Sequence, residues 1–136
     1  MKILAIVLVA LLAACASTPK KTCQVTPSIF CEPFAELAAT LPLSEQQRLL
    51  EMRADEYWRL HLGFGMGVRN RFDLWGDNEL TAFFRENGVS HPDDMSVPFI
   101  GGFVEYLRGG PVDVENAIRI YRLPPPPPAV APRIAA

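Results

Sequence analysis

Four side chains in this sequence could carry acid–base or metal chemistry: His61, His91, Asp93 and Asp94. Imidazole and carboxylate groups serve as general acids and bases, and they also bind divalent metals. If the segment that contains His61 packs against residues 91–94, these four groups form a hydrolase site or a metal site. Both segments also have a structural interpretation, because His61 lies on an apolar stripe and residues 91–94 are typical of a helix start. We therefore expect no firm catalytic residue, no metal and no cofactor.

Arg69 and Asn70 are polar residues at the end of a largely apolar segment. They could bind an anion, but we expect Arg69 to pair with Asp93 or Asp94. No nucleophile is indicated, because Ser96 has no evident base beside it.

Glycines alternate in residues 62–70, LGFGMGVRN. A phosphate-binding loop needs a strand before it and a helix N-terminus after it, and this segment has neither. Gly63 and Gly67 are four residues apart, so on a helix they share one face and would let another helix approach closely. Each glycine costs a helix up to about 1 kcal/mol relative to alanine, which close packing must offset.

Hydrophobic periodicity predicts the elements that position these residues. Apolar positions recur every three or four residues, and no segment alternates convincingly with period two. We expect helices at about 45–52, 54–75, 77–88, 91–108 and 113–122. The second is apolar around much of its circumference, which is typical of a buried helix. The prediction is an all-α domain over residues 32–123, a small irregular bundle of about four to five helices around a buried central helix.

The N-terminus has the pattern of a bacterial lipoprotein signal. Residues 3–14 are apolar, too short for a span of about 20 residues. The end of this run, LAAC, resembles a lipobox, which implies a signal peptide at 1–14, lipidation of Cys15 and a flexible linker at 15–31. In lipoproteins an aspartate after the lipidated cysteine commonly retains the protein in the inner membrane, so with Ala16 at this position the resemblance implies the outer membrane, facing the periplasm. A plain secretory signal is the alternative.

Two further cysteines remain, Cys23 and Cys31. In an oxidising compartment we expect a disulfide between them, fastening the linker to the domain. A metal site is not expected there, because no other cysteine or histidine lies nearby to complete four ligands.

Residues 124–136 are proline-rich, with five consecutive prolines at 124–128. Such a run favours polyproline II, as a disordered spacer or as a ligand for an aromatic groove. The net charge is −2 and no basic stripe is present, so nucleic acid is not an expected partner.

With HLGFGMGVRN, then LW, HPDDMS and YLRG in this order, residues 43–122 resemble a small uncharacterised bacterial domain. Its pattern is H-x-G-x-G-M-x-x-R-N, then L-W, then H-P-D-D-M-S and Y-L-x-G. The resemblance implies no activity, because the function of that family is unknown.

Three functions remain open from the sequence. The first is a lipid-anchored envelope protein with a helical binding or structural module for a protein partner. The second is a small periplasmic hydrolase or metal-binding protein using His61, His91 and Asp93 or Asp94. The third is a periplasmic inhibitor or immunity-type lipoprotein. A helical domain of about 90 residues rarely builds a deep pocket, which favours binding.

Overall fold

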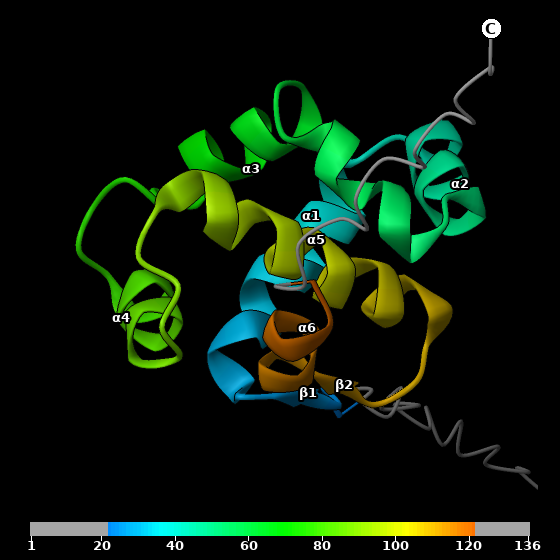
Figure 1. Cartoon of the computed structure of the whole chain (residues 1–136). Coiled ribbons are helices and arrows are strands. Elements are labelled where there is room, and N and C mark those ends of the chain that lie inside the picture. The colour runs from blue at the N-terminus through cyan, green and yellow to red at the C-terminus, as the bar shows by residue number, and fades with distance from the viewer. Residues whose placement is uncertain (1–21, 122–136) are drawn as a thin grey trace, which may run out of the picture.

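Short helices surround one long helix in this protein (Figure 1). The computed structural model describes residues 22–121. In chain order the elements are β1 (Val25–Thr26), the 3-10 helix η1 (Ser28–Phe30), α1 (Cys31–Thr40), α2 (Leu43–Glu51), the 3-10 helix η2 (Ala54–Leu60), α3 (Phe64–Arg71), α4 (Glu79–Glu86), α5 (Pro92–Arg108), β2 (Val112–Asp113) and α6 (Val114–Tyr121). The prediction of a helical fold is confirmed, with one short sheet added.

The long helix, α5, begins and ends where its sequence predicts. His91 is its N-cap, Pro92 occupies the first turn, and Asp93 and Asp94 follow, where negative charge suits the helix dipole. At the other end Gly109 adopts a φ of 83°, a left-handed conformation that glycine reaches without strain.

The centre of the domain is α5, and the prediction that residues 54–75 form the central helix is wrong. Figure 1 shows α5 in the middle, and it contacts α1, α2, α3, α4, α6, η2 and β2. Its inward side chains are fully buried: Met95, Phe99, Ile100, Phe103 and Val104.

Residues 54–75 are not one helix. They form η2 and α3, separated by residues 61–63, and a turn follows Arg71. The break falls at Gly63, whose φ of −97° and ψ of −90° are not helical. Glycine weakens a helix, so three glycines in five residues favour interruption here.

The folded region also begins earlier than predicted. Residues 25–31 were expected to belong to a linker, but Val25 and Phe30 are buried in the core. The strand β1 pairs in parallel with β2, with Val25 opposite Val112, so the two ends of the domain meet. The helix α1 was not predicted, although Phe30, Phe34 and Leu37 have helical spacing.

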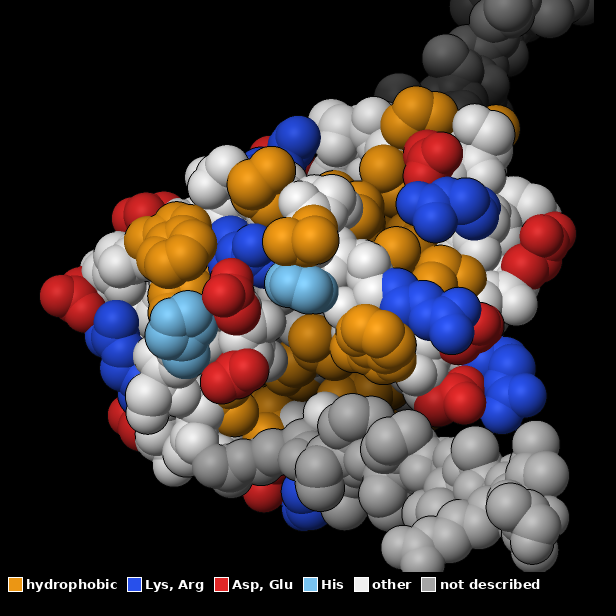
Figure 2. Space-filling model, turned by 45° about the horizontal axis from the view of Figure 1, so that its top comes forward, with side chains coloured by type: hydrophobic (Ala, Val, Ile, Leu, Met, Phe, Trp, Pro, Cys, Tyr) orange, Lys and Arg blue, Asp and Glu red, His pale blue; other side chains and the backbone are white. Residues whose placement is uncertain are grey.

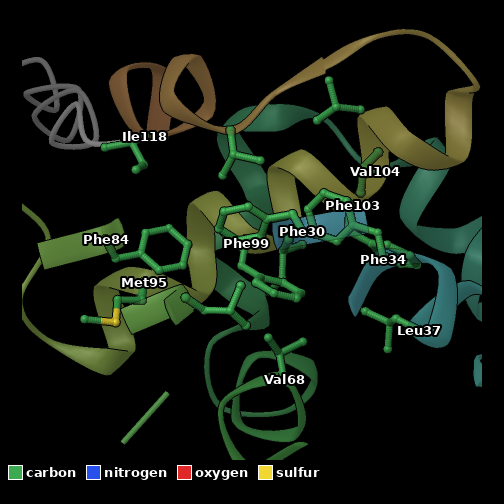
Figure 3. Packing of buried hydrophobic residues seen from close by; sticks show 14 of the residues in the cluster. Phe30, Phe34, Leu37, Val68, Phe84, Met95, Phe99, Phe103, Val104 and Ile118 are labelled. Atoms are coloured by element: carbon green, nitrogen blue, oxygen red, sulfur yellow. The ribbon is translucent and has the colours of Figure 1, made fainter. Parts of the chain in front are cut away.

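Aromatic rings fill the interior (Figure 3). Phe34 meets Phe99 edge to face at 5.2 Å between ring centroids, and Phe30 meets Phe84 in the same way at 5.6 Å. Such arrangements place the positive edge of one ring on the negative face of the other. These contacts join α1 to α5 and η1 to α4.

Within residues 22–121 no helix is long and apolar enough to cross a membrane. The predicted signal peptide, the lipidation site Cys15 and the proline-rich segment at 124–136 lie outside the described residues.

Candidate functional site

A buried arginine, Arg69, lies where α3 meets the start of α5. Its side chain is only 5% exposed. The Nη1 group donates to Oγ of Ser96 at 3.0 Å, and Nη2 donates to the carbonyl oxygen of His61 at 2.9 Å. The Nε atom lies 3.1 Å from Oδ1 of Asp93, an ion pair too bent to be a hydrogen bond. A buried charge needs such partners, so Arg69 ties three chain segments together.

Neighbouring residues make room for the Arg69 side chain. A Cβ atom on Gly65 would lie 3.2 Å from Oγ of Ser96 and 3.3 Å from Nη1 of Arg69. Ser96 itself donates from Oγ to the carbonyl oxygen of Asp93 at 2.7 Å. We call these four residues, Gly65, Arg69, Asp93 and Ser96, the Arg69 cluster.

The two histidines lie beside the cluster, but the structure does not bring their rings together. Nδ1 of His91 accepts from the backbone N–H of Asp93 at 3.2 Å and lies 3.7 Å from Oδ2 of the same residue. Nδ1 of His61 lies 3.0 Å from the carbonyl oxygen of Trp58. A carbonyl only accepts, so Nδ1 of His61 carries the proton. Figure 2 shows the histidines at two separate places on one face, with acidic side chains between them.

This arrangement gives little basis for the predicted acid–base chemistry. His91 caps α5, Asp93 forms an ion pair with Arg69, and Asp94 is exposed. No group of three or more His, Cys, Asp or Glu side chains is arranged to hold a metal within residues 22–121. Asn70, the other candidate for anion binding, is exposed and outside the Arg69 cluster.

Cys23 and Cys31 form a disulfide with a Cα–Cα distance of 5.9 Å. The bridge closes a loop around β1 and η1 and anchors it to the first residue of α1. It therefore fastens residue 23, close to the start of the described chain, to the core.

The predicted packing role of Gly63 and Gly67 is wrong. A Cβ atom on either residue would meet nothing within 4 Å, because both face solvent. Close approach occurs instead at Gly65 and in α5, where a Cβ on Gly101 would fall 2.0 Å from Cε2 of Tyr121. The spacing of glycines could not reveal which of them faces the interior, because the helix break at Gly63 changes the phase of the pattern.

An exposed apolar surface adjoins the Arg69 cluster. It consists of Trp58, Leu62, Met66 and Trp75, whose residues are 53%, 72%, 51% and 55% exposed. We call it the tryptophan face. Figure 2 shows hydrophobic side chains gathered around the histidines, arginines and acidic groups on this side of the molecule. Trp58, Leu62 and Met66 follow one another at intervals of four residues. This spacing is helical, and the sequence predicted a buried helix here.

Trp75 is held in place by charged and aromatic neighbours. Its ring centre lies 5.8 Å from Cζ of Arg69 and 6.3 Å from the ring of His91. The turn that carries it is fixed by Asn78, whose Nδ2 donates to the carbonyl oxygen of Asp73 at 2.8 Å. Asp73 has a positive φ of 46°, and its carboxylate occupies the space that a Cβ on Gly76 would need. The turn therefore presents Trp75 in one defined position.

A depression of about 390 Å³ lies near this turn. It is lined by Ile29, Arg71, Phe72, Asp73, Asn78, Glu79 and Leu80. Arg71 is paired with Glu36 at 2.7 Å, so its charge is already compensated. Neither histidine lines it.

No curated protein and no solved structure matches the chain. A family model described as "Domain of unknown function (DUF6794)" matches residues 26–107. The match extends from β1 to the last turn of α5, so it includes the Arg69 cluster and the tryptophan face, and it begins earlier than residue 43, where the sequence resemblance started. The chain belongs to this family of unknown function, DUF6794.

Proposed function

We propose that this chain is a lipid-anchored cell-envelope protein whose helical domain binds a protein partner through the tryptophan face. The observation that carries the proposal is that four large apolar residues of η2, α3 and the neighbouring turns are each more than half exposed, namely Trp58, Leu62, Met66 and Trp75, with the Trp75 ring against the buried Arg69. Apolar side chains that are exposed singly need no explanation, whereas grouped ones mark binding surfaces. Tryptophan is also among the residues most enriched at positions that dominate binding energy.

The Arg69 cluster supports this proposal through pre-organisation. Trp75 rests on a guanidinium that is itself held by Ser96 and the carbonyl of His61. A side chain fixed before binding loses less conformational entropy on association. The face therefore offers a large apolar contact area, and Trp75 loses little conformational entropy when a partner binds.

The position of the face relative to the tether suits a partner rather than the membrane surface. Thr22, the first described residue, follows Cys15 by seven residues, which span at most about 25 Å when extended. The chain enters the domain at β1, and Figure 1 shows β1 and α3 at opposite ends of the molecule. A lipid on Cys15 would therefore be attached at the end of the domain opposite α3.

The hydrolase and metal proposals gain no support from the geometry. They require His61 and His91 to converge, and the two rings lie apart with different backbone partners. An inhibitor or immunity role is a special case of partner binding, and no residue of the face specifies it.

Photo-crosslinking in cells tests the proposal. A photoreactive phenylalanine at Leu62 should give an adduct of one defined mass, because this position lies within the tryptophan face. The matched control is Leu43, which is 81% exposed but lies on α2. An adduct at Leu62 that Trp75→Ala abolishes supports the proposal. Equal labelling from both positions, or none from Leu62, overturns it.

A further inference from the structure

The described chain ends against η2, the element that carries Trp58. Tyr121, the last residue of α6, places its ring 5.5 Å from the ring of Tyr57 between centroids. Tyr57 is fully buried in η2, and the next residue, Trp58, is 53% exposed. The chain that follows Tyr121 therefore starts beside the η2 end of the face.

The sequence that follows is chemically suited to an exposed indole. Prolines 124–128 have no backbone N–H and offer only carbonyl acceptors. The Trp58 indole offers an N–H donor and an aromatic ring, and Cζ of Arg59 lies over this ring at 5.6 Å from its centre. Proline-rich segments bind aromatic surfaces in this way, and their stiffness means that little entropy is lost.

The reach of the chain agrees with this pairing. Pro124 follows Tyr121 by three residues, about 10 Å of extended chain. Five prolines add about 15 Å in polyproline II, enough to lie along η2. A segment tethered this closely has an effective concentration on the order of millimolar, so a weak contact suffices.

We propose that residues 123–128 of the same chain dock on the exposed indole of Trp58 and cover the η2 end of the tryptophan face. Leu62, Met66 and Trp75 stay open. If the tryptophan face binds a protein partner as proposed above, the proline segment competes with that partner for part of the face. This consequence of the docking rests on the proposed function. Docking itself requires only Trp58 and the prolines.

Tryptophan fluorescence of the whole chain tests the docking, because Trp58 and Trp75 are its only tryptophans. In a Trp75→Phe background the emission reports Trp58 alone. Replacing all five prolines by serine should then shift this emission to longer wavelength and increase its quenching by acrylamide. In the matched Trp58→Phe background, which reports Trp75, the same replacement should change neither quantity.

Three results overturn the inference. The first is unchanged Trp58 emission and quenching after the proline replacement. The second is an equal change at Trp75, which means a general effect on the domain. The third is a Trp58 signal that depends on protein concentration, which assigns the docking to a second copy of the chain.

Crosslinking separates the inference from the proposed function. The Leu62 crosslinker is placed in chains with and without the five prolines. If the adduct forms in both while Trp58 fluorescence is unchanged, the docking inference fails and the proposed function stands. If Trp58 fluorescence changes but Leu62 gives no adduct, the docking stands and the proposed function fails.

Discussion

Arg69 and Asp93 form the ion pair that joins α3 to the first turn of α5, with 3.1 Å between Nε and Oδ1. The pair is asymmetric, since the arginine side chain is 5% exposed and the aspartate is 45% exposed. The carboxylate thus reaches in from the surface to a charge that has little contact with water. The arginine gains most from the contact, and the consequences of breaking it follow from this asymmetry.

Asp93→Asn should lower the free energy of unfolding by about 1–3 kcal/mol, because it leaves a buried charge with fewer partners. The matched control is Glu36→Gln, which breaks the Arg71–Glu36 pair. There the carboxylate is 48% exposed and the arginine is 38% exposed. Exposed pairs contribute about 0–1 kcal/mol, so the control should change little. Urea denaturation measures both variants, and equal losses would contradict the role given to the burial of Arg69.

Gly65→Ala should destabilise the fold, whereas Gly67→Ala should not. A Cβ on Gly65 would lie 3.1 Å from the carbonyl oxygen of Leu60 and 3.3 Å from Nη1 of Arg69. At Gly67 the space is open, and alanine in a helix interior stabilises by up to about 1 kcal/mol. Thermal unfolding of the two variants compares them directly. A destabilised Gly67→Ala would restore the packing role that the sequence suggested.

Local signals predicted much of the second half of the fold. The proline and aspartates after His91 and the glycine at 109 mark both ends of α5, and the pairing expected for Arg69 is the one the structure contains. The middle of the chain was predicted less well. Helical periodicity identifies an apolar stripe but not the side that is buried, so it predicts residues 54–75 as a buried helix although Trp58, Leu62 and Met66 are exposed.

The start of the fold depends on contacts distant in sequence. The strands β1 and β2 are two residues each, too short to show alternation, and they pair across the whole domain. The side-chain partners of Arg69 also lie far from it in the sequence. Ser96 is 27 residues away, and nothing in its local sequence indicates that its hydroxyl will meet a guanidinium.

Cys15→Ser should abolish membrane attachment, because the lipobox-like sequence before it makes Cys15 the predicted site of acylation. Cells supplied with radiolabelled palmitate should label the unaltered chain and not this variant. The control is the Cys23→Ser, Cys31→Ser double variant, which removes the disulfide and should keep the label. Palmitate on the Cys15→Ser chain would contradict the prediction.

Removing the disulfide should lower the free energy of unfolding by about 2–3 kcal/mol, since the bridge closes a short loop and restricts the unfolded chain. The same double serine variant tests this by urea denaturation. Dithiothreitol should destabilise the unaltered chain and leave the double variant unchanged. No response of the unaltered chain would mean that the bridge contributes little to stability.

Alkaline pH should destabilise the domain through Tyr121. Burial raises the pKa of Tyr121 to about 12, from 10.0 for an ordinary tyrosine, and burial raises the pKa of Tyr57 in the same direction. Between these values the unfolded chain releases a proton that the folded chain retains. The free energy of unfolding is therefore undiminished below pH 10 and falls as the pH rises toward about 12. Urea denaturation at about pH 9 and about pH 11 measures this decline. Tyr121→Phe should reduce this decline, and an unreduced decline in that variant would assign the effect to other groups.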